Sequence, residues 1–278
     1  MKKSGHTHLF AWIAAAALIS LAVMIWMLWG RTAVRRDASA KDDSLQKVLN
    51  SGRFIFGFDA DFPPMSFADE KGEFTGFDID MIQEVCNRLG VELVKQPINW
   101  DTKEDDLNGG RADCLGSLSI TLGRAERMNL SEPYVKEDLI FVVPGNSDTK
   151  WLRDLKGKKV GVQTGSTTLE ALEKLDIYKD ILVVPFEENL ALLQQLKEGK
   201  LDAALVDSLV AYSFMYSSNE RYFVLPESLG QKKFVLGFRK NDKELRNKVQ
   251  DILGEMKASG ALGKISKKWF ESDITIIK

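Results

Sequence analysis

The feature that most constrains the fold is an alternation of short apolar runs with segments of helical spacing. The apolar runs have no helical period and predict buried strands; they cover residues 54–58, 91–94, 113–118, 139–143, 159–162, 181–184, 203–206 and 234–238. Helical spacing predicts helices at residues 78–89, 190–196, 243–259 and 262–270. Strands that alternate with helices favour open, largely parallel sheets covered by helices.

Two places in this pattern predict that the chain passes between two lobes. The run 139–143 ends at Pro144-Gly145, after which a new alternation begins, and the run 223–226 precedes the last strand. We therefore expect an α/β chain with two lobes joined by a double-stranded hinge. Lobe 1 would hold residues 45–138 and 226–278, and lobe 2 would hold residues 139–225.

The N-terminal segment predicts a membrane anchor or a signal peptide in residues 1–30. Residues 9–29 form an uncharged apolar run of twenty-one residues, which as a helix would span about 30 Å of hydrocarbon. The nearest small-residue cleavage site, residues 38–40, lies beyond three arginines, which favours an uncleaved anchor over a cleaved signal. Residues 31–44 are charged and alanine-rich without an apolar face, so we expect a tether there.

Composition excludes several classes of function. The net charge is −2 and no basic patch interleaved with aromatic residues follows the N-terminal segment, which argues against nucleic-acid binding. The two histidines, His6 and His8, both precede the apolar run, so histidine triads and histidine-ligated zinc are excluded from residues 31–278. Cys86 and Cys114 are expected to be core residues, although a disulfide between them stays open. We expect neither a metal nor a cofactor.

Polar side chains gather in the stretch 113–134. Ser117, Ser119 and Thr121 place three hydroxyls at the end of a predicted strand. Thr121 is a good N-cap for a helix at residues 122–128, and Arg124 then falls in the first turn, where the helix dipole disfavours a cation. Because helical side chains lean toward the N-terminus, Arg124 can reach back to the hydroxyls and bind a carboxylate. The alternative is an ordinary surface arginine.

Four strand ends supply candidate ligand-binding residues, because ligands of open α/β sheets bind at the carboxyl ends of strands. These are residues 59–62, 117–124, 163–168 and Asp207. In residues 163–168 a glycine turn precedes a predicted helix start, whose amides at 166–168 suit an anion, and Thr167 to Glu170 resembles a capping box.

A ligand touched by Arg124, these amides, Asp207 and Phe62 would carry a carboxylate, an ammonium and a side chain, as a free amino acid does. The alternatives are that Asp207 caps the next segment, that Phe62 is a core residue, and that Gly165 forms an ordinary turn.

Six segments together resemble a known family. They are GFDADFPPM from Gly57, GFDIDMIQEV from Gly76, SLSITLGRAER from Ser117, LSEPY from Leu130, LKGKKVGVQTGST from Leu155 and GKLDAALVDS from Gly199. In this order and spacing, over roughly residues 45–270, the chain resembles the extracytoplasmic solute-binding proteins of ABC importers for polar amino acids. That family has a two-lobed, periplasmic-binding-protein-like type II fold.

The resemblance implies roles for the polar residues of the strand ends. Arg124 would hold the ligand carboxylate, helped by the backbone at Ser119 and Thr167. Asp207 would pair with the α-ammonium, with Ser117 assisting. One residue fewer separates Asp113 from Ser117 than is usual in the family, which leaves the register of that strand open.

The resemblance also implies how the ligand side chain is held. Phe62 and Trp100 would pack on it, Asp59 would help to select its polar end, and Ser166 belongs to the helix-start amides. Asp59 could pair with a basic side chain or accept from an amide, so the amino acid stays open.

Three functions are weighed on this basis. The first is a monomeric, extracytoplasmic protein that captures a free amino acid between its lobes and delivers it to a membrane permease, without catalysis. The second is a dehydratase on the same fold, which would need a general acid in the cleft. The third is a membrane-tethered sensor, which the predicted anchor favours but for which the short N-terminal tail leaves no output domain.

Overall fold

The computed structural model describes residues 42–218 and 220–277 of the chain. Residues 43–278 form one compact unit. The predicted membrane segment 9–29 and nearly all of the predicted tether lie outside the described residues. Among the helices of the described part, none is long and apolar enough to cross a membrane.

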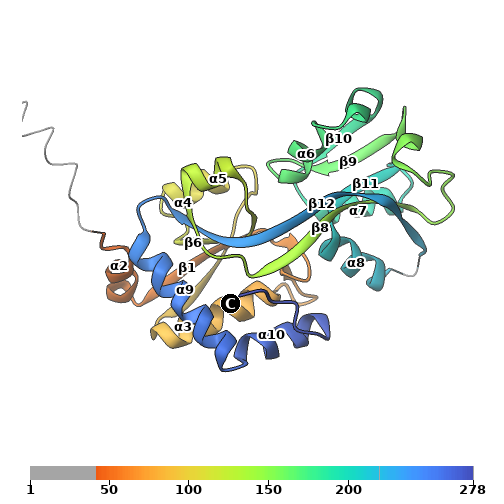
Figure 1. The fold of residues 1–278 in the computed structure, drawn as a ribbon. Coiled ribbons are helices and arrows are strands. Elements are labelled where there is room, and N and C mark those ends of the chain that lie inside the picture. Colours follow the sequence, from red (N-terminus) through yellow and green to blue (C-terminus); the bar gives the residue numbers. More distant parts are fainter. Residues whose placement is uncertain (1–41, 219, 278) are drawn as a thin grey trace, which may run out of the picture. The chain divides into compact units, whose positions relative to one another are not determined.

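The described residues contain one large sheet of nine strands (Figure 1). Its order is β10-β9-β11-β8-β12-β6-β1-β5, with β7 pairing with β12. The strand bounds are β1 Arg53–Phe58, β5 Glu92–Pro97, β6 Cys114–Ser119, β7 Met128–Leu130, β8 Val135–Pro144, β9 Lys159–Gln163, β10 Leu182–Phe186, β11 Ala203–Asp207 and β12 Tyr222–Arg239.

The sheet divides into two lobes around its two longest strands. Strands β1, β5 and β6 pair in parallel on one side and belong to lobe 1, whereas β9, β10 and β11 pair in parallel on the other and belong to lobe 2. Between them β8 and β12 pair antiparallel with each other, and β12 pairs antiparallel with β6 and β8 with β11. The two-lobed α/β architecture predicted from sequence is confirmed, and the lobe boundaries at residues 138 and 226 stay a prediction.

The strands predicted at 139–143 and 234–238 are present, but both are longer than predicted, and the second includes the predicted crossing at 223–226. Residues 139–143 are the second half of β8, and residues 223–226 and 234–238 are parts of β12. Polar residues at 136–138 and 227–233 interrupt the apolar pattern, but the backbone ladder continues through them from Lys136↔Lys233 to Ser228↔Ile140, with one register shift. Apolar runs mark buried stretches of strand, and a strand that crosses between lobes is exposed along part of its length.

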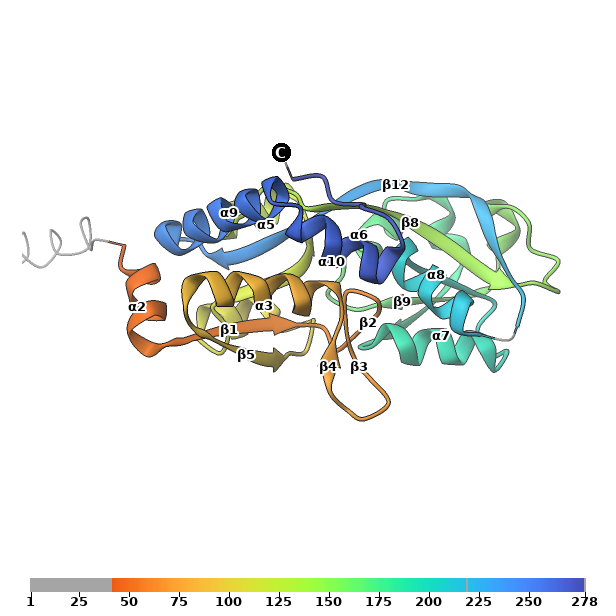
Figure 2. The same ribbon diagram turned by 90° about the horizontal axis from the view of Figure 1, so that it is seen from below.

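Helices cover both lobes. Lobe 1 holds α2 Ser44–Ser51, α3 Phe77–Leu89, α4 Lys103–Asn108, α5 Leu122–Arg127, α9 Lys243–Ala258 and α10 Ala261–Phe270. In lobe 2 the helices are α6 Thr167–Leu172, α7 Asn189–Lys197 and α8 Ser208–Ser217, with 3-10 turns at Leu152–Leu155 and Asp176–Asp180. Figure 2 shows α3, α9 and α10 side by side, and these three helices contact one another. Helix α8 was missed in the sequence because its apolar residues follow no helical period.

Residues next to α3 and α5 determine where the first helix ends and where the second begins. Gly90 ends α3 in the left-handed conformation, and Thr121 caps α5 by accepting a hydrogen bond from the Arg124 amide. Cys86 and Cys114 are buried free thiols. After β1 the chain forms a second, small sheet, in which Asp61–Phe62 (β2) pairs with Ser66–Ala68 (β3) and Phe74–Thr75 (β4) pairs with β3.

A β-bulge settles the register of β6. Phe234 and Val235 of β12 face Ser119 and Leu118, but Gly237 already faces Leu115. Leu236 therefore lies opposite two residues, Gly116 and Ser117, and Ser117 adopts a left-handed conformation with φ of 47°. The bulge turns the Ser117 side chain at the point where the polar strand end begins.

Gly76, which precedes α3, should be intolerant of a side chain. Its φ is 135°, and an added Cβ would overlap the Met65 carbonyl group. Gly76→Ala should lower the free energy of unfolding by about 3 kcal/mol, measured by chemical denaturation. Gly254 lies within α9 with open space around it, so Gly254→Ala should raise the same quantity by about 0.5–1 kcal/mol. Equal effects of the two substitutions would contradict the described backbone.

Candidate functional site

A small cavity lies between the two lobes; it has about 320 Å³ of space not filled by protein atoms when the solvent at its mouth is counted, and the centre of a water-sized sphere can occupy only about 20 Å³ of it. Both lobes line it, at the carboxyl ends of β1, β9 and β11 and along β6 and β12. The lining residues are Asp59, Phe62, Trp100, Ser117, Ser119, Arg124, Gln163, Ser166, Thr167, Asp207 and Phe234. The structure therefore brings together all nine residues singled out in the sequence, and it adds Gln163 and Phe234.

Arg124 provides the positive charge of the cavity. Its side chain is only 4% exposed, and its Nη1 donates to the Ser119 carbonyl oxygen at 2.8 Å. Burial lowers the pKa of the guanidinium, while Glu170, Glu104 and Asp207 oppose that shift. The interpretation of Arg124 as a surface arginine is wrong. The hydrogen bond to Ser119 holds one edge of the Arg124 guanidinium group in place, and the cavity offers the space in which this group could bind an anion.

Asp207 provides a negative charge from the other lobe. It ends β11 and is buried, and although it occupies the N-cap position of α8 its side chain makes no capping hydrogen bond. The alternative that Asp207 merely caps the next segment is thus wrong. Burial raises the pKa of its carboxyl group, whereas contact with Glu137 and the charge of Arg124 lower it. Asp207 and Arg124 are opposite charges on facing lobes.

Ser117 belongs to a buried hydrogen-bond network. Its Oγ donates to Asp78 Oδ2 at 2.8 Å, and its backbone N–H donates to the Tyr134 hydroxyl at 2.9 Å. Tyr134 in turn donates to Asp78 Oδ2 at 3.0 Å. Burial raises the pKa of Asp78 to about 7. Because the Ser117 hydroxyl proton points to Asp78, its lone pairs are available to accept a hydrogen bond from the cavity side.

The start of α6 differs from the predicted capping box by one residue. The N-cap is Ser166, whose Oγ accepts from the Thr168 amide at 3.2 Å and donates to the Gln163 carbonyl at 2.7 Å. The amide of Thr168 is therefore satisfied within the turn. Gly165 has a φ of 61° and lies against the backbone of Trp100 and Asp101, so the turn is also a point of contact between the lobes.

Aromatic side chains form the apolar walls. Phe62 meets Phe234 edge to face, with ring centroids 5.7 Å apart, and Trp100 is 8% exposed. Phe62 therefore belongs both to the core and to the cavity wall. Phe234 lies in the predicted strand 234–238, and only the pairing of β12 with β6 brings it to the cavity.

Asp59 and Gln163 join the lobes directly. Gln163 Nε2 donates to Asp59 Oδ2 at 2.6 Å, and the Asp61 amide donates to Asp59 Oδ1 at 2.9 Å. Burial raises the pKa of Asp59. A second hollow shares Asp59 and Trp100 with the cavity and is lined by three further carboxylates but no lysine or arginine: Asp61, Glu187 and Glu188. Burial, then the nearby Glu188, raises the pKa of Asp61 to about 6.

Lys103 was not predicted and forms another link between the lobes. Its Nζ donates to the Trp100 carbonyl at 2.7 Å and to the Gly165 carbonyl at 2.8 Å, and it lies 5.1 Å from the centroid of the Trp100 ring. Burial and the nearby Arg124 lower its pKa to about 8. Nothing in the polar sequence of α4 marks one lysine as buried. With Asp59–Gln163, this contact holds the described lobes together.

Two lobes on a shared pair of strands, with a polar cavity between them, define a cleft-type solute-binding protein. A family model described as "Bacterial extracellular solute-binding proteins, family 3" matches residues 54–272. The chain belongs to this family. The resemblance that the sequence suggested is thereby confirmed.

Known proteins similar to this chain include a cystine-binding protein and two proteins of solved structure. L-cystine-binding protein TcyJ of Escherichia coli (strain K12) is 32% identical over 239 residues, which cover 85% of this chain and 89% of that protein. The crystal structure of Tv2483 bound to L-arginine has a TM-score of 0.81 and 28% identity, covering 85% of this chain and 98% of that one. A Streptococcus pneumoniae ABC uptake transporter substrate-binding protein with bound histidine has a TM-score of 0.81 and 29% identity, covering 85% and 99%.

Removing the Tyr134 hydroxyl should weaken the fold beneath the cavity. Tyr134→Phe leaves the Ser117 amide and Asp78 Oδ2 each without one partner, so we expect a loss of about 2 kcal/mol in the free energy of unfolding. The exposed Tyr216 offers the control, and Tyr216→Phe should change stability by less than about 0.5 kcal/mol.

The deficit of Tyr134→Phe should also grow with pH. The raised pKa of Asp78 means that the folded state keeps a proton that the unfolded state loses above roughly pH 4, so stability falls as pH rises toward 7. Loss of the Tyr134 donor raises that pKa further and widens this range. Denaturation at several pH values tests this, and a deficit independent of pH would contradict the assigned network.

Proposed function

We propose that this protein captures a free polar amino acid in the cavity between its lobes and presents it to the permease of an ABC importer. The observation that carries the proposal is the placement of Arg124 and Asp207, one on each lobe, on the same buried cavity. The α-carboxylate of an amino acid matches the first and its α-ammonium matches the second. The nine residues predicted from sequence are the proposed ligand-binding residues.

Electrostatics support an occupant of this kind. A buried charge is costly unless an opposite charge or hydrogen bonds compensate it. Arg124 and Asp207 are both nearly inaccessible, and the structure gives them no ion pair with each other among the described residues. A zwitterion placed between them would compensate both charges at once and would connect lobe 1 to lobe 2. Binding and closure of the lobes would then be one event.

The side-chain end of the ligand would point toward Asp59 and the acidic hollow beyond it. Four carboxylates line that region, and the pKa values of Asp59 and Asp61 are raised. Groups that donate N–H hydrogen bonds, above all cationic ones, would relieve this unfavourable clustering. We therefore propose a polar amino acid whose distal end carries N–H donors.

The relatives support the same ligand class. TcyJ is named for L-cystine, and the two solved structures hold L-arginine and histidine. All three ligands share an α-carboxylate and an α-ammonium and have nitrogen at the distal end. We also propose that residues 9–29 anchor the protein at the outer face of the membrane, that residues 31–44 form the tether, and that it acts as a monomer.

The geometry favours binding over catalysis. A dehydratase on this fold would place a general acid against its substrate and would have little use for an ammonium partner, whereas Asp207 faces the cavity opposite Arg124. Assays with prephenate and arogenate separate these functions. Turnover of either compound would replace the binding proposal.

Calorimetric titration of the full chain with the twenty amino acids, L-ornithine and L-cystine tests the proposed ligand class. We expect saturable binding of at least one polar amino acid. Absence of binding across this panel would contradict the proposal.

Arg124→Ala tests the proposed carboxylate contact. The substitution should lower affinity by more than about 100-fold, which is roughly 3 kcal/mol, because the ligand carboxylate would be buried without a partner. Arg127 lies on the same helix, is exposed and pairs with Glu104. Arg127→Ala removes the same charge and should leave affinity within about threefold. Equal losses would indicate long-range electrostatics rather than direct contact.

Asp59→Asn tests the selection of the distal end. Affinity for L-arginine should fall by about tenfold or more, because a charge-assisted hydrogen bond is lost, while any affinity for L-glutamine should stay within about threefold. Glu70→Gln, at an exposed turn of the same lobe, controls for net charge. An equal loss of affinity for L-arginine and L-glutamine would indicate that Asp59 maintains the structure of the cavity and does not select the distal end of the ligand.

A further inference from the structure

A second carboxyl group lies behind Asp207, outside the residues that line the cavity. Glu137, the third residue of β8, is 3% exposed, and neither of its carboxyl oxygens accepts a hydrogen bond of good geometry from a donor in the described residues. Asp207 lies opposite Leu139 in the ladder between β11 and β8, two residues along β8 from Glu137, and the carboxyl groups of Glu137 and Asp207 are close enough to shift each other's pKa. Two acceptor groups therefore meet in the interior with no donor assigned between them.

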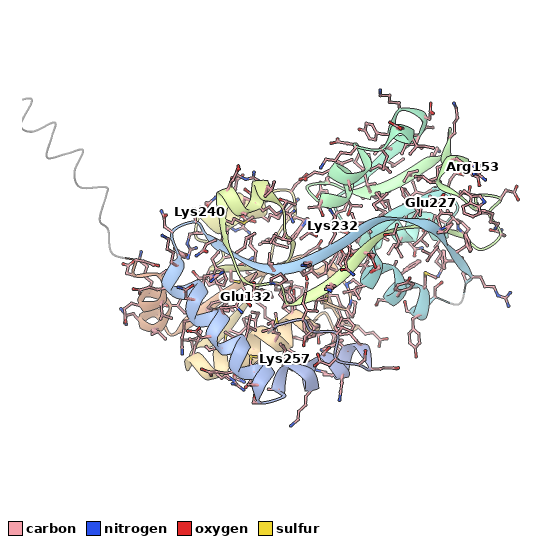
Figure 3. The ribbon with its side chains drawn as sticks, viewed as in Figure 1. Glu132, Arg153, Glu227, Lys232, Lys240 and Lys257 are labelled. Carbon is pink, nitrogen blue, oxygen red and sulfur yellow. The ribbon has the colours of Figure 1, made fainter. Side chains whose placement is uncertain are left out.

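Few positive charges compensate this pair. Lys232 lies directly opposite Glu137 in the ladder between β8 and β12, in the middle of β12 in Figure 3, yet it forms no ion pair with Glu137 among the described residues. The backbone N–H of Ser208, at the start of α8, faces Glu137. Asp138 adds a negative charge on the same strand, and the Lys136 side chain is exposed. Arg124 and Lys232 act on Asp207.

Two buried carboxylates in contact cannot both be ionised at moderate cost, so one proton is shared between them. Burial raises the pKa of Glu137, and the contact with Asp207 raises it further. The same contact lowers the pKa of Asp207, as does the charge of Arg124. The proton therefore belongs on Glu137, and the negative charge belongs on Asp207.

We propose that Glu137 is a positioning residue that stays protonated and donates a hydrogen bond to one carboxyl oxygen of Asp207. The second oxygen of Asp207 then faces the cavity as a charged acceptor. The role at Asp207 rests on the proposed function, because the acceptor is meant for the ligand ammonium. No proton is released on binding: one carboxylate meets one ammonium, and Glu137 remains neutral. Without the proton the ammonium would meet two negative charges, and without a donor the Asp207 side chain would lose its orientation.

Glu137→Gln and Glu137→Met separate the proton from the shape of the side chain. The amide of Gln can donate to Asp207 at every pH, whereas Met fills similar volume and donates nothing. Asp138→Asn removes a carboxylate from the neighbouring position of β8 and is the matched control for charge.

The first measurement is thermal unfolding of the ligand-free full chain between about pH 5 and pH 9. In the wild type, the folded state keeps the Glu137 proton while the unfolded state loses it above roughly pH 4.5, so stability falls as pH rises. Glu137→Gln should remove this contribution. The melting temperature of the variant minus that of the wild type should therefore increase by about 2 °C or more between pH 5 and pH 9. Asp138→Asn should follow the wild type. If the melting temperature of Glu137→Gln fell with pH as steeply as that of the wild type, the proposal that Glu137 is protonated in the folded state would be wrong.

The second measurement is affinity for L-arginine, L-histidine and L-cystine near pH 7. Glu137→Gln should bind whichever of these the wild type binds within about threefold, and Glu137→Met should lose about tenfold, the equivalent of one hydrogen bond. Equal losses in both variants would overturn the donor role. If the wild type binds none of these three ligands, the comparison uses whichever other amino acid it binds. If it binds none of the twenty amino acids, L-ornithine or L-cystine, the proposed function fails, and the pH dependence of unfolding still decides whether Glu137 holds the proton.

Discussion

The antiparallel pairing of β8 with β12 is the constraint on which the rest of the structure depends. Each strand continues beyond the pair into a different lobe, where β8 pairs with β11 and β12 pairs with β6. The sheet is therefore continuous through both lobes, and within the described residues these two strands carry the chain between them. Any movement of one lobe against the other must bend or twist this ladder, which limits closure to a small set of paths.

The chemistry of the cavity follows from the same topology. Parallel strands of each lobe end at one edge, so Asp59, Gln163 and Asp207 reach the cleft from three different strands. The central pair adds Phe234 on the cavity side and Glu137 behind Asp207. Asp59 and Asp207, whose carboxyl groups have raised pKa values, thus share the cavity with one buried arginine. Burial of these carboxyl groups is costly, and under the proposed function a bound ammonium group would offset that cost, so that an electrostatically prepared site would gain affinity.

Much of this could be predicted from the sequence, and the remainder has physical causes. Apolar runs located most of the strands, and the cap at Thr121 gave the start of α5 because this signal acts over a few residues. Eight of the nine cavity residues could be chosen because they follow recognisable strand ends, and Trp100 was chosen only from the family resemblance. The length of β8 and β12 could not be predicted, since polar crossing segments lose the apolar pattern. Lys103 and Glu137 were missed because burial of a charged side chain depends on tertiary contacts. The bulge at Ser117 was visible only as a shortened spacing.

Helix α2, near one end of the described chain, and the segment at the other end both attach to the same lobe. The Ser44 hydroxyl accepts a hydrogen bond from the Leu245 amide at the start of α9, and near the other end Thr275 bridges to Val135 while the Ile276 amide donates to the Tyr134 carbonyl. Both ends of the described chain are therefore fastened to lobe 1. If the protein were held through either end, lobe 1 would be the fixed lobe. Closure would then move lobe 2 relative to it.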